Sequence, residues 1–206
     1  MSDGADFGAD LRRLVPDLDP TLAEDLWAEL VAAHAGDHRR YHTLAHARLV
    51  RDNTVGLGAA AGVDDPVVAI AAWYHDAVYV GLPGDDERAS ADLASAVAER
   101  IGRGDVADRL RTLILTTIDH RPVDEAAAVL VDADLAILAA SPLDYERYRR
   151  RVRAEYGHVA DDDWRRGRAA VLRSLLGRDR LFHSPGGRGR EPAARRNLLT
   201  ELTRTT

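Results

Sequence analysis

Residues 71–79 read AAWYHDAVY, so an apolar run ends in an adjacent histidine and aspartate, His75 and Asp76. Every position from Val67 to Tyr74 is apolar, which predicts an element buried on all sides. A buried Asp is rarely left without a partner, and imidazole and carboxylate groups both bind divalent cations. Neighbouring residues of a helix point about 100° apart, so the pair can share one ion only at a helix end or if the Asp reaches across. The alternative is an Asp that bonds backbone groups beside a core histidine.

Two other segments place ligand-type residues inside apolar, helical patterns. His42 and His46 lie upstream of the His75-Asp76 pair, and Asp134 lies downstream in VDADL. The order is therefore His, then His-Asp, then Asp, with each group on a different expected helix.

This ordered series resembles the HD superfamily of metal-dependent phosphohydrolases, most closely a subgroup of small, single-domain bacterial members. The similarity covers nearly the whole chain. Beyond the three groups above it is carried by Arg40-Tyr41-His42, Trp73-Tyr74, Val78-Tyr79, Glu87 with Ser90-Ala91, Thr117 with His120, Asp132 to Leu138, Tyr145 with Tyr148, Glu155-Tyr156, Gly167-Arg168 and Ala194 to Leu198. The resemblance implies an all-α, HD-domain-like helical bundle.

Composition favours the same fold class. Ala, Leu, Arg, Asp and Glu dominate and aromatic residues are few, which favours helix over sheet. Capping pairs such as Asp19-Pro20, Asp65-Pro66 and Ser141-Pro142 mark helix starts. We expect about eight to nine helices, near residues 20–36, 41–57, 66–76, 85–101, 105–117, 124–139, 142–156, 161–176 and from 191 onward. Residues 1–206 form one domain in this interpretation, with a flexible N-terminus at 1–15 and a flexible loop at 184–191.

Several function classes are disfavoured. The net charge of −6 gives no reason to expect a nucleic-acid polymer as partner. The absence of cysteine excludes disulfides, thiolate metal sites and a Cys nucleophile. No apolar run approaches a membrane span and the first ten residues do not resemble a signal peptide, so we expect a cytoplasmic protein without a membrane partner. Helical proteins of this size often dimerise, so a homodimer stays open.

The expected metal ligands are His46, His75, Asp76 and Asp134. This mixed nitrogen–oxygen set suits Mn, Fe, Co, Ni, Zn or Mg. Four protein ligands leave two positions of a six-coordinate ion open for water and a substrate oxygen. His42 is the alternative first ligand, since it lies four residues before His46 on the same helical face. The resemblance favours His46. We expect His34, His158 and His183 at the surface, and the Tyr145, Tyr148 and Tyr156 face in the core.

Substrate-binding and catalytic roles follow for residues near this set. Arg40, Tyr41 and His42 are expected to contact substrate phosphate, because Arg offers planar paired donors. Arg39 has no place in the pattern. Glu87 would act as general acid or base, or cap a helix. His120 would protonate the leaving group, complete a second metal site, or cap a helix. Asp76 would act in catalysis through the metal.

The best-supported function is hydrolysis of a small phosphate ester or nucleotide by a water that the metal activates. One alternative is an HD-type di-iron oxygenase, in which His120, Glu87 or His42 supply the additional ligands. Another is a non-catalytic, metal-stabilised helical binding protein, which a closed coordination sphere would favour.

Overall fold

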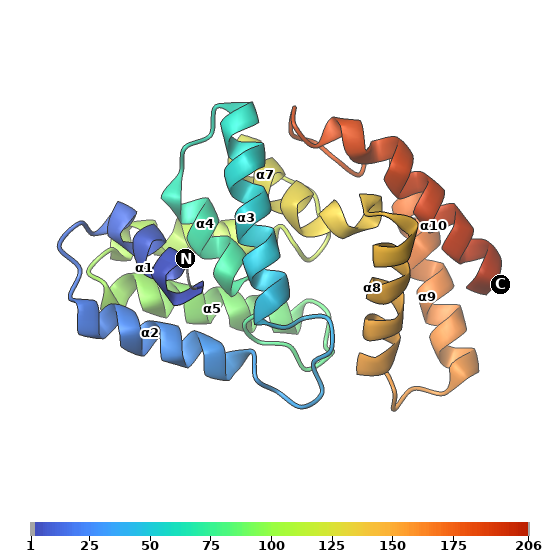
Figure 1. Cartoon of the computed structure of the whole chain (residues 1–206), viewed down its shortest axis with the longest axis horizontal. Coiled ribbons are helices and arrows are strands. Elements are labelled where there is room, and N and C mark those ends of the chain that lie inside the picture. The colour runs from blue at the N-terminus through green and yellow to red at the C-terminus, as the bar shows by residue number, and fades with distance from the viewer. Residues whose placement is uncertain (1–2, 206) are drawn as a thin grey trace.

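The computed structural model describes residues 3–205, and within that range every regular element is a helix (Figure 1). An all-α bundle is therefore confirmed, with ten α-helices against the eight to nine expected. The elements are α1 (Asp3–Leu14), α2 (Pro20–Ala33), α3 (Leu44–Ala61), α4 (Pro66–Tyr74), α5 (Asp85–Arg100), the 3₁₀ helix η1 (Gly104–Val106), α6 (Ala107–Leu115), α7 (Glu125–Asp134), the 3₁₀ helix η2 (Leu135–Ala139), α8 (Pro142–Glu155), α9 (Asp161–Leu176), the 3₁₀ helix η3 (Arg188–Arg190) and α10 (Glu191–Thr205).

The predicted capping residues start their helices. The carboxylate of Asp19 accepts a hydrogen bond from the backbone N–H of Thr21, and that of Asp65 accepts one from Val67. The Ser141 hydroxyl accepts the N–H of Asp144 at the start of α8. These side chains satisfy N–H groups that have no partner inside the helix.

Helix α4 is the centre of the first half of the molecule. All its residues from Val67 to Tyr74 are buried, as the apolar run predicted. Because no face of α4 is polar, it needs neighbours on every side, and it packs against α1, α3, α5, α6 and α7. The end of this central helix, where His75 and Asp76 follow Tyr74, therefore lies inside the bundle.

The N-terminal segment is more ordered than we expected. Residues 3–14 form a regular helix that buries Phe7 and Leu11 completely. The carboxylate of Asp10 accepts hydrogen bonds from the indole of Trp73 at 3.0 Å and from the guanidinium of Arg51 at 2.7 Å. This segment is thus docked on α4 and α3 through both apolar and charged contacts.

The apolar core has two parts, and the chain passes between them at α7. Most buried side chains of α1 to α7 form one cluster, whereas Val131, η2, α8, α9 and α10 contribute to a second. Figure 1 shows α8, α9 and α10 grouped on one side of the molecule. Asp134 stands at the junction, as the last residue of α7.

The expected flexible loop at 184–191 contains η3 and the start of α10. Ser184 is buried, and its N–H and hydroxyl both donate to Asp132. Among residues 3–205 no single helix is both long and apolar enough to cross a membrane, although Glu125–Ala139 and Pro142–Glu155, bent by 104°, pass that test as a pair.

Candidate metal centre

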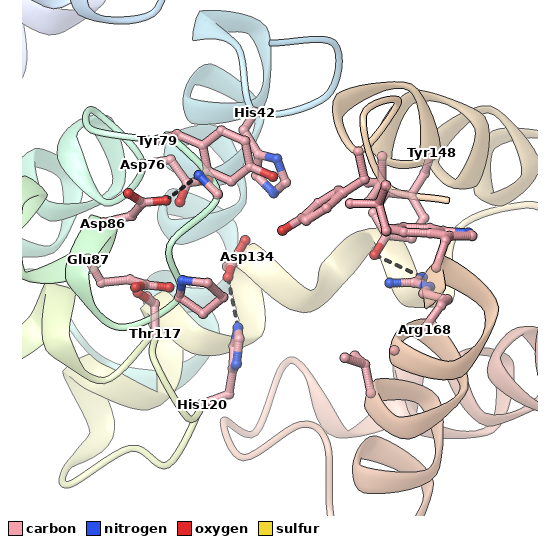
Figure 2. Close-up of a pocket in the computed structure, with 18 of the residues that line it drawn as sticks. His42, Asp76, Tyr79, Asp86, Glu87, Thr117, His120, Asp134, Tyr148 and Arg168 are labelled. Carbon is pink, nitrogen blue, oxygen red and sulfur yellow. Dashed lines mark hydrogen bonds and ion pairs between the residues drawn. The ribbon is translucent and has the colours of Figure 1, made fainter. Parts of the chain in front are cut away.

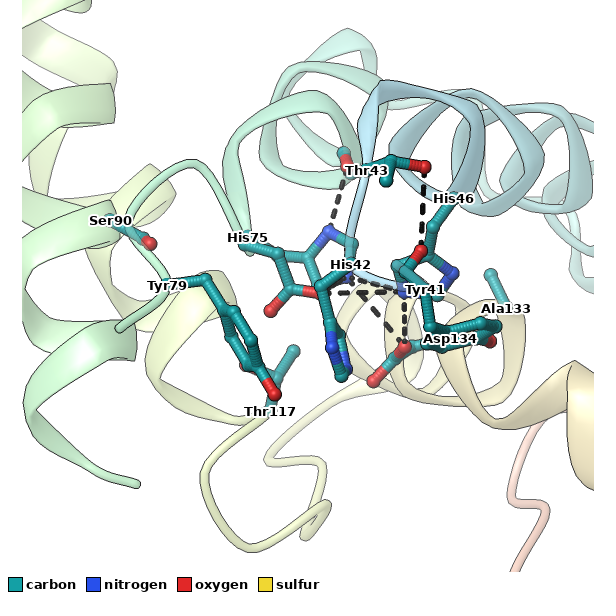
Figure 3. Close-up of polar contacts among 12 residues, drawn as sticks. Tyr41, His42, Thr43, His46, His75, Tyr79, Ser90, Thr117, Ala133 and Asp134 are labelled. Atoms are coloured by element: carbon teal, nitrogen blue, oxygen red, sulfur yellow. Dashed lines mark hydrogen bonds and ion pairs between the residues drawn. The ribbon is translucent and has the colours of Figure 1, made fainter. Parts of the chain in front are cut away.

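Four side chains from α3, from the turn after α4 and from α7 converge on one point. His46 lies in the first turn of α3, His75 and Asp76 directly follow α4, and Asp134 ends α7. His46 Nε2 is 3.3 Å from His75 Nε2 and 3.2 Å from Asp134 Oδ1. Asp76 Oδ2 is 3.1 Å from His75 Nε2 and 3.4 Å from His46 Nε2. Figure 3 shows His46, His75 and Asp134 pointing toward one another.

These spacings suit a single divalent ion. Donor atoms bound at about 2.1 Å to one ion lie roughly 3.0–3.4 Å apart, close to the distances found here. His46, His75 and Asp134 each offer a ligand atom within 4.8 Å of the others. His75 Nδ1 lies 2.9 Å from the carbonyl of Ala72, and that bond directs the lone pair of Nε2 toward the cluster. The Nδ1 of His46 is buried and has no hydrogen-bond partner among the described residues.

In the cluster, the positive charge of the imidazoles offsets the negative charge of the carboxylates. Burial works against ionisation of all four groups, yet the carboxylates hold the pKa of His75 well above its usual value. Likewise the pKa values of Asp76 and Asp134 lie well below the usual range despite burial, because His75, His46 and, for Asp134, His120 stand beside them. Two ionised carboxylates thus require positive charge at this point, which a divalent cation would supply in place of the imidazole protons.

The helix end resolves the geometry of the His-Asp pair. α4 stops at Tyr74, His75 and Asp76 form the turn that follows it, and Asp76 Oδ2 lies 3.1 Å from His75 Nε2. This is one of the two arrangements that the sequence allowed.

Arg39 holds this arrangement in place, although no sequence motif assigns it a role. Its guanidinium is buried and donates to the carbonyls of His42, Asp76 and Ala77 at 2.6–2.8 Å. It therefore ties the loop before α3 to the loop after α4. Its contacts are to backbone carbonyls distant in sequence, and no local motif marks such a contact.

His42 and His46 have different surroundings, which separates the two candidates for the first ligand. His42 Nδ1 lies 2.7 Å from Glu155 Oε2, outside the cluster. Its ring stacks on Tyr79 with centroids 4.1 Å apart. Of these two histidines, the structure brings only His46 into the cluster, although His42 lines the cleft described below.

The other two expected substrate contacts do not line that cleft. The Arg40 side chain is exposed and donates to the backbone carbonyls of Asp37 and Arg39. The Tyr41 ring lies between His46 and Tyr148, with centroids 4.6 and 4.7 Å away. The buried Tyr41 hydroxyl has no hydrogen-bond partner in the described part of the chain.

His120 lies beside the cluster, whereas Glu87 lines the cleft over it. Glu87 accepts the N–H of Gly84 and so caps α5, and it also lines the cleft. His120 Nε2 is 3.0 Å from Asp134 Oδ2, the oxygen turned away from His46. His120 has a φ of 51°, the one non-glycine residue with positive φ among residues 3–205. That strained backbone turns its ring toward Asp134.

A cleft of about 540 Å³ opens over the cluster (Figure 2). Its inner wall carries His42, Asp76, Tyr79, Asp86, Glu87, Thr117, His120 and Asp134, and its outer wall is formed by α8 and α9 with Tyr148, Val152, Tyr156, Trp164, Arg168 and Val171. We expected the tyrosine face in the core, and Tyr145 is buried there. Tyr148 packs against the second apolar cluster and also lines the cleft. The expectation is wrong for Tyr156, which is half-buried and lines the cleft.

We expected three further histidines at the surface, and the structure describes all of them. His34, expected at the surface, is buried, and its Nδ1 lies 2.9 Å from the carbonyl of Leu30. That expectation is wrong because α2 ends at Ala33 and the chain turns inward there. His158 is exposed, as expected, and His183 is half-buried.

No known family model, curated protein or solved structure matches the chain.

Proposed function

We propose that the protein is a metal-dependent phosphohydrolase of the HD type, which cleaves a small phosphate ester or nucleotide. The observation that carries this proposal is the uneven exposure of the cluster. The imidazoles of His46 and His75 are 3% and 1% exposed, whereas the carboxylates of Asp76 and Asp134 are 17% and 16% exposed and line the cleft. A purely structural metal site is expected to be closed on all sides.

The charge of the cleft also supports metal dependence. Its lining contains Asp76, Asp86, Glu87, Asp134 and Asp163 but a single arginine, Arg168. The guanidinium of Arg168 is already paired with Glu201 at 2.8 Å. A phosphorylated molecule would be repelled by this lining unless a divalent cation were present.

When bound, a divalent ion would polarise the phosphoryl group and lower the pKa of water beside it. The residues of this chain then have separate tasks. His46, His75, Asp76 and Asp134 hold the ion, and His120, oriented by Asp134, delivers a proton to the leaving oxygen. Glu87 stays in place as the cap of α5, at the edge of the cleft.

On this proposal, the organic part of the substrate binds against the outer wall. Tyr148, Val152, Tyr156, Trp164 and Val171 give this wall an aromatic and aliphatic surface opposite the carboxylates. Such a surface accommodates a ring or another apolar group while the phosphate faces the metal cluster.

The test is the metal content and phosphate-ester hydrolysis of wild type, Asp76→Ala and the matched control His158→Ala, all purified without added metal or chelator. We expect about one divalent ion per chain and hydrolysis in wild type and control, and loss of both in Asp76→Ala with unchanged helical content. Full turnover by Asp76→Ala would overturn the assigned site. About two irons per chain with O₂ consumption would support the di-iron alternative.

A further inference from the structure

A second cavity, of about 860 Å³, adjoins the metal cleft and is lined by arginines. Arg121, Arg173, Arg178 and Arg180 line it, together with only two carboxylates, Asp119 and Asp179. Most other arginines between residues 88 and 168 form ion pairs. No ion pair is found for these four arginines among residues 3–205. In a chain with a net charge of −6, this is a local excess of positive charge.

Arg178 is the least satisfied member of the group. Its Nη1 atom is buried and has no hydrogen-bond partner in the described chain. Burial and the neighbouring charge of Arg121 lower its pKa. Burying a charged donor without a partner is costly, so its retention points to an anionic partner that binds in this cavity.

The backbone segment 176–182, which carries Arg178 and Arg180, is held in place by hydrogen bonds. The guanidinium of Arg195 donates to the carbonyls of Leu176 and Arg178 at 2.9 and 2.7 Å. Glu191 accepts the N–H groups of Leu181 and Phe182. Because 176–182 is anchored at both ends, Arg178 and Arg180 project from a fixed turn, and such preorganisation favours ligand binding.

His120 connects the two cavities, since it lines both and bonds Asp134 of the metal cluster. We propose that the arginine cavity binds a phosphate group of the substrate that is not cleaved, while the scissile phosphate occupies the metal cleft. This inference rests on the proposed function. The guanidinium group matches phosphate oxygens in pairs, which suits this role.

The substrate class is thereby narrowed. A molecule with a single phosphate would leave the arginine cavity empty, whereas one with two separate phosphates or a polyphosphate chain would occupy both sites. The favoured substrates are therefore bisphosphorylated small molecules or nucleoside polyphosphates.

Calorimetric titration with inorganic pyrophosphate, in buffer free of divalent metal, tests the anion site without any turnover. The full-length proteins are wild type, Asp76→Ala, the double variant Arg121→Gln/Arg178→Gln, and Arg151→Gln, an exposed arginine of α8 outside both cavities. We expect equal affinity in wild type, Asp76→Ala and Arg151→Gln, and at least about tenfold weaker binding in the double variant.

Unchanged affinity in the double variant would overturn the proposal, as would loss of binding in Asp76→Ala alone. If the double variant does not fold, Arg173→Gln/Arg180→Gln replaces it, because both side chains are exposed. Weaker binding in that variant supports the site, and equal binding overturns it. Arginine-dependent pyrophosphate binding in a protein that hydrolyses no phosphate compound would leave the anion site standing and refute the phosphohydrolase instead.

Discussion

Glu155, the last residue of α8, is hydrogen-bonded to His42, which lies 113 residues earlier in the chain. Its Oε2 lies 2.7 Å from His42 Nδ1, and its Oε1 accepts the backbone N–H groups of residues 40, 41 and 42 at 2.7–2.9 Å. Tyr79 donates to the same carboxylate at 3.3 Å. One buried carboxylate from the second half of the molecule thus fixes the segment that leads to His46 and its cluster.

Replacing this carboxylate should destabilise the protein strongly. In Glu155→Ala, three backbone N–H groups and the His42 ring lose their partner inside the protein, which we expect to cost about 3–5 kcal/mol of the free energy of unfolding. Urea denaturation at pH 7 measures it. The control Glu24→Ala, on the exposed side of α2, should change stability by less than about 0.5 kcal/mol. A similar small effect for both variants would contradict this role.

The lowered pKa of Glu155 predicts how the stability of the protein changes at low pH. Burial raises the pKa of Glu155, but His42 and the backbone N–H groups lower it more, to about 2. The ionised Glu155 therefore contributes about 3 kcal/mol to the free energy of unfolding. This contribution is complete above the ordinary pKa of about 4.5 and is lost as the pH falls toward 2. The stability difference between wild type and Glu155→Ala should shrink over that range.

His34 predicts a pH effect in a higher range. Burial, aided by the charge of Arg39, lowers its pKa to about 4, although the bond to Leu30 acts in the opposite direction. Between pH 6.5 and 4 the unfolded chain therefore binds a proton that the folded protein does not. As the pH falls through this range, His34 should lower the free energy of unfolding by about 3 kcal/mol.

His34→Gln isolates this contribution, since the Gln amide can still donate to the Leu30 carbonyl but does not titrate. Urea denaturation at pH 7, 5.5 and 4.5 should show a weaker dependence on pH in His34→Gln than in wild type. His158→Gln, exposed, should follow wild type. Parallel curves for wild type and His34→Gln would mean that His34 titrates normally.

Gly187 predicts a steric effect at the loop that packs on α7. A Cβ atom at this position would collide with Asp132 Oδ2, which is buried and accepts the N–H groups of His183 and Ser184. Gly187→Ala should therefore displace the loop and cost about 1–3 kcal/mol. Gly189→Ala is the matched control, because its Cβ would meet nothing within 4 Å. Equal thermal stability of the two variants would show that the loop adjusts freely.

The order of His46, His75, Asp76 and Asp134 along the chain, together with the resemblance, predicted that these four side chains share one site, and the structure brings them together. The sequence predicted helix starts wherever a cap and a proline coincide, as at Asp65. It did not predict α1, since the glycines that weaken its helical signal allow close packing: a Cβ at Gly4 would lie 2.9 Å from the indole of Trp27.

The supporting residues could not be predicted in the same way. In the sequence, Glu155 stands out only through the resemblance, and Arg39 belongs to no motif. Their roles depend on contacts with backbone groups far away in the chain, and any of the other carboxylates or arginines would give the same local signal. The tertiary fold alone distinguishes them.

His120 provides the sharpest separation of metal binding from catalysis. If it donates a proton to the leaving group, His120→Asn should keep the metal and lose about 100- to 10,000-fold in hydrolysis. Asn tolerates positive φ, so the backbone at this position, with its φ of 51°, should be retained. Metal content and kcat are the measurements. Loss of an ion together with activity would instead make His120 a metal ligand, and unchanged kcat would reduce it to a positioning residue for Asp134.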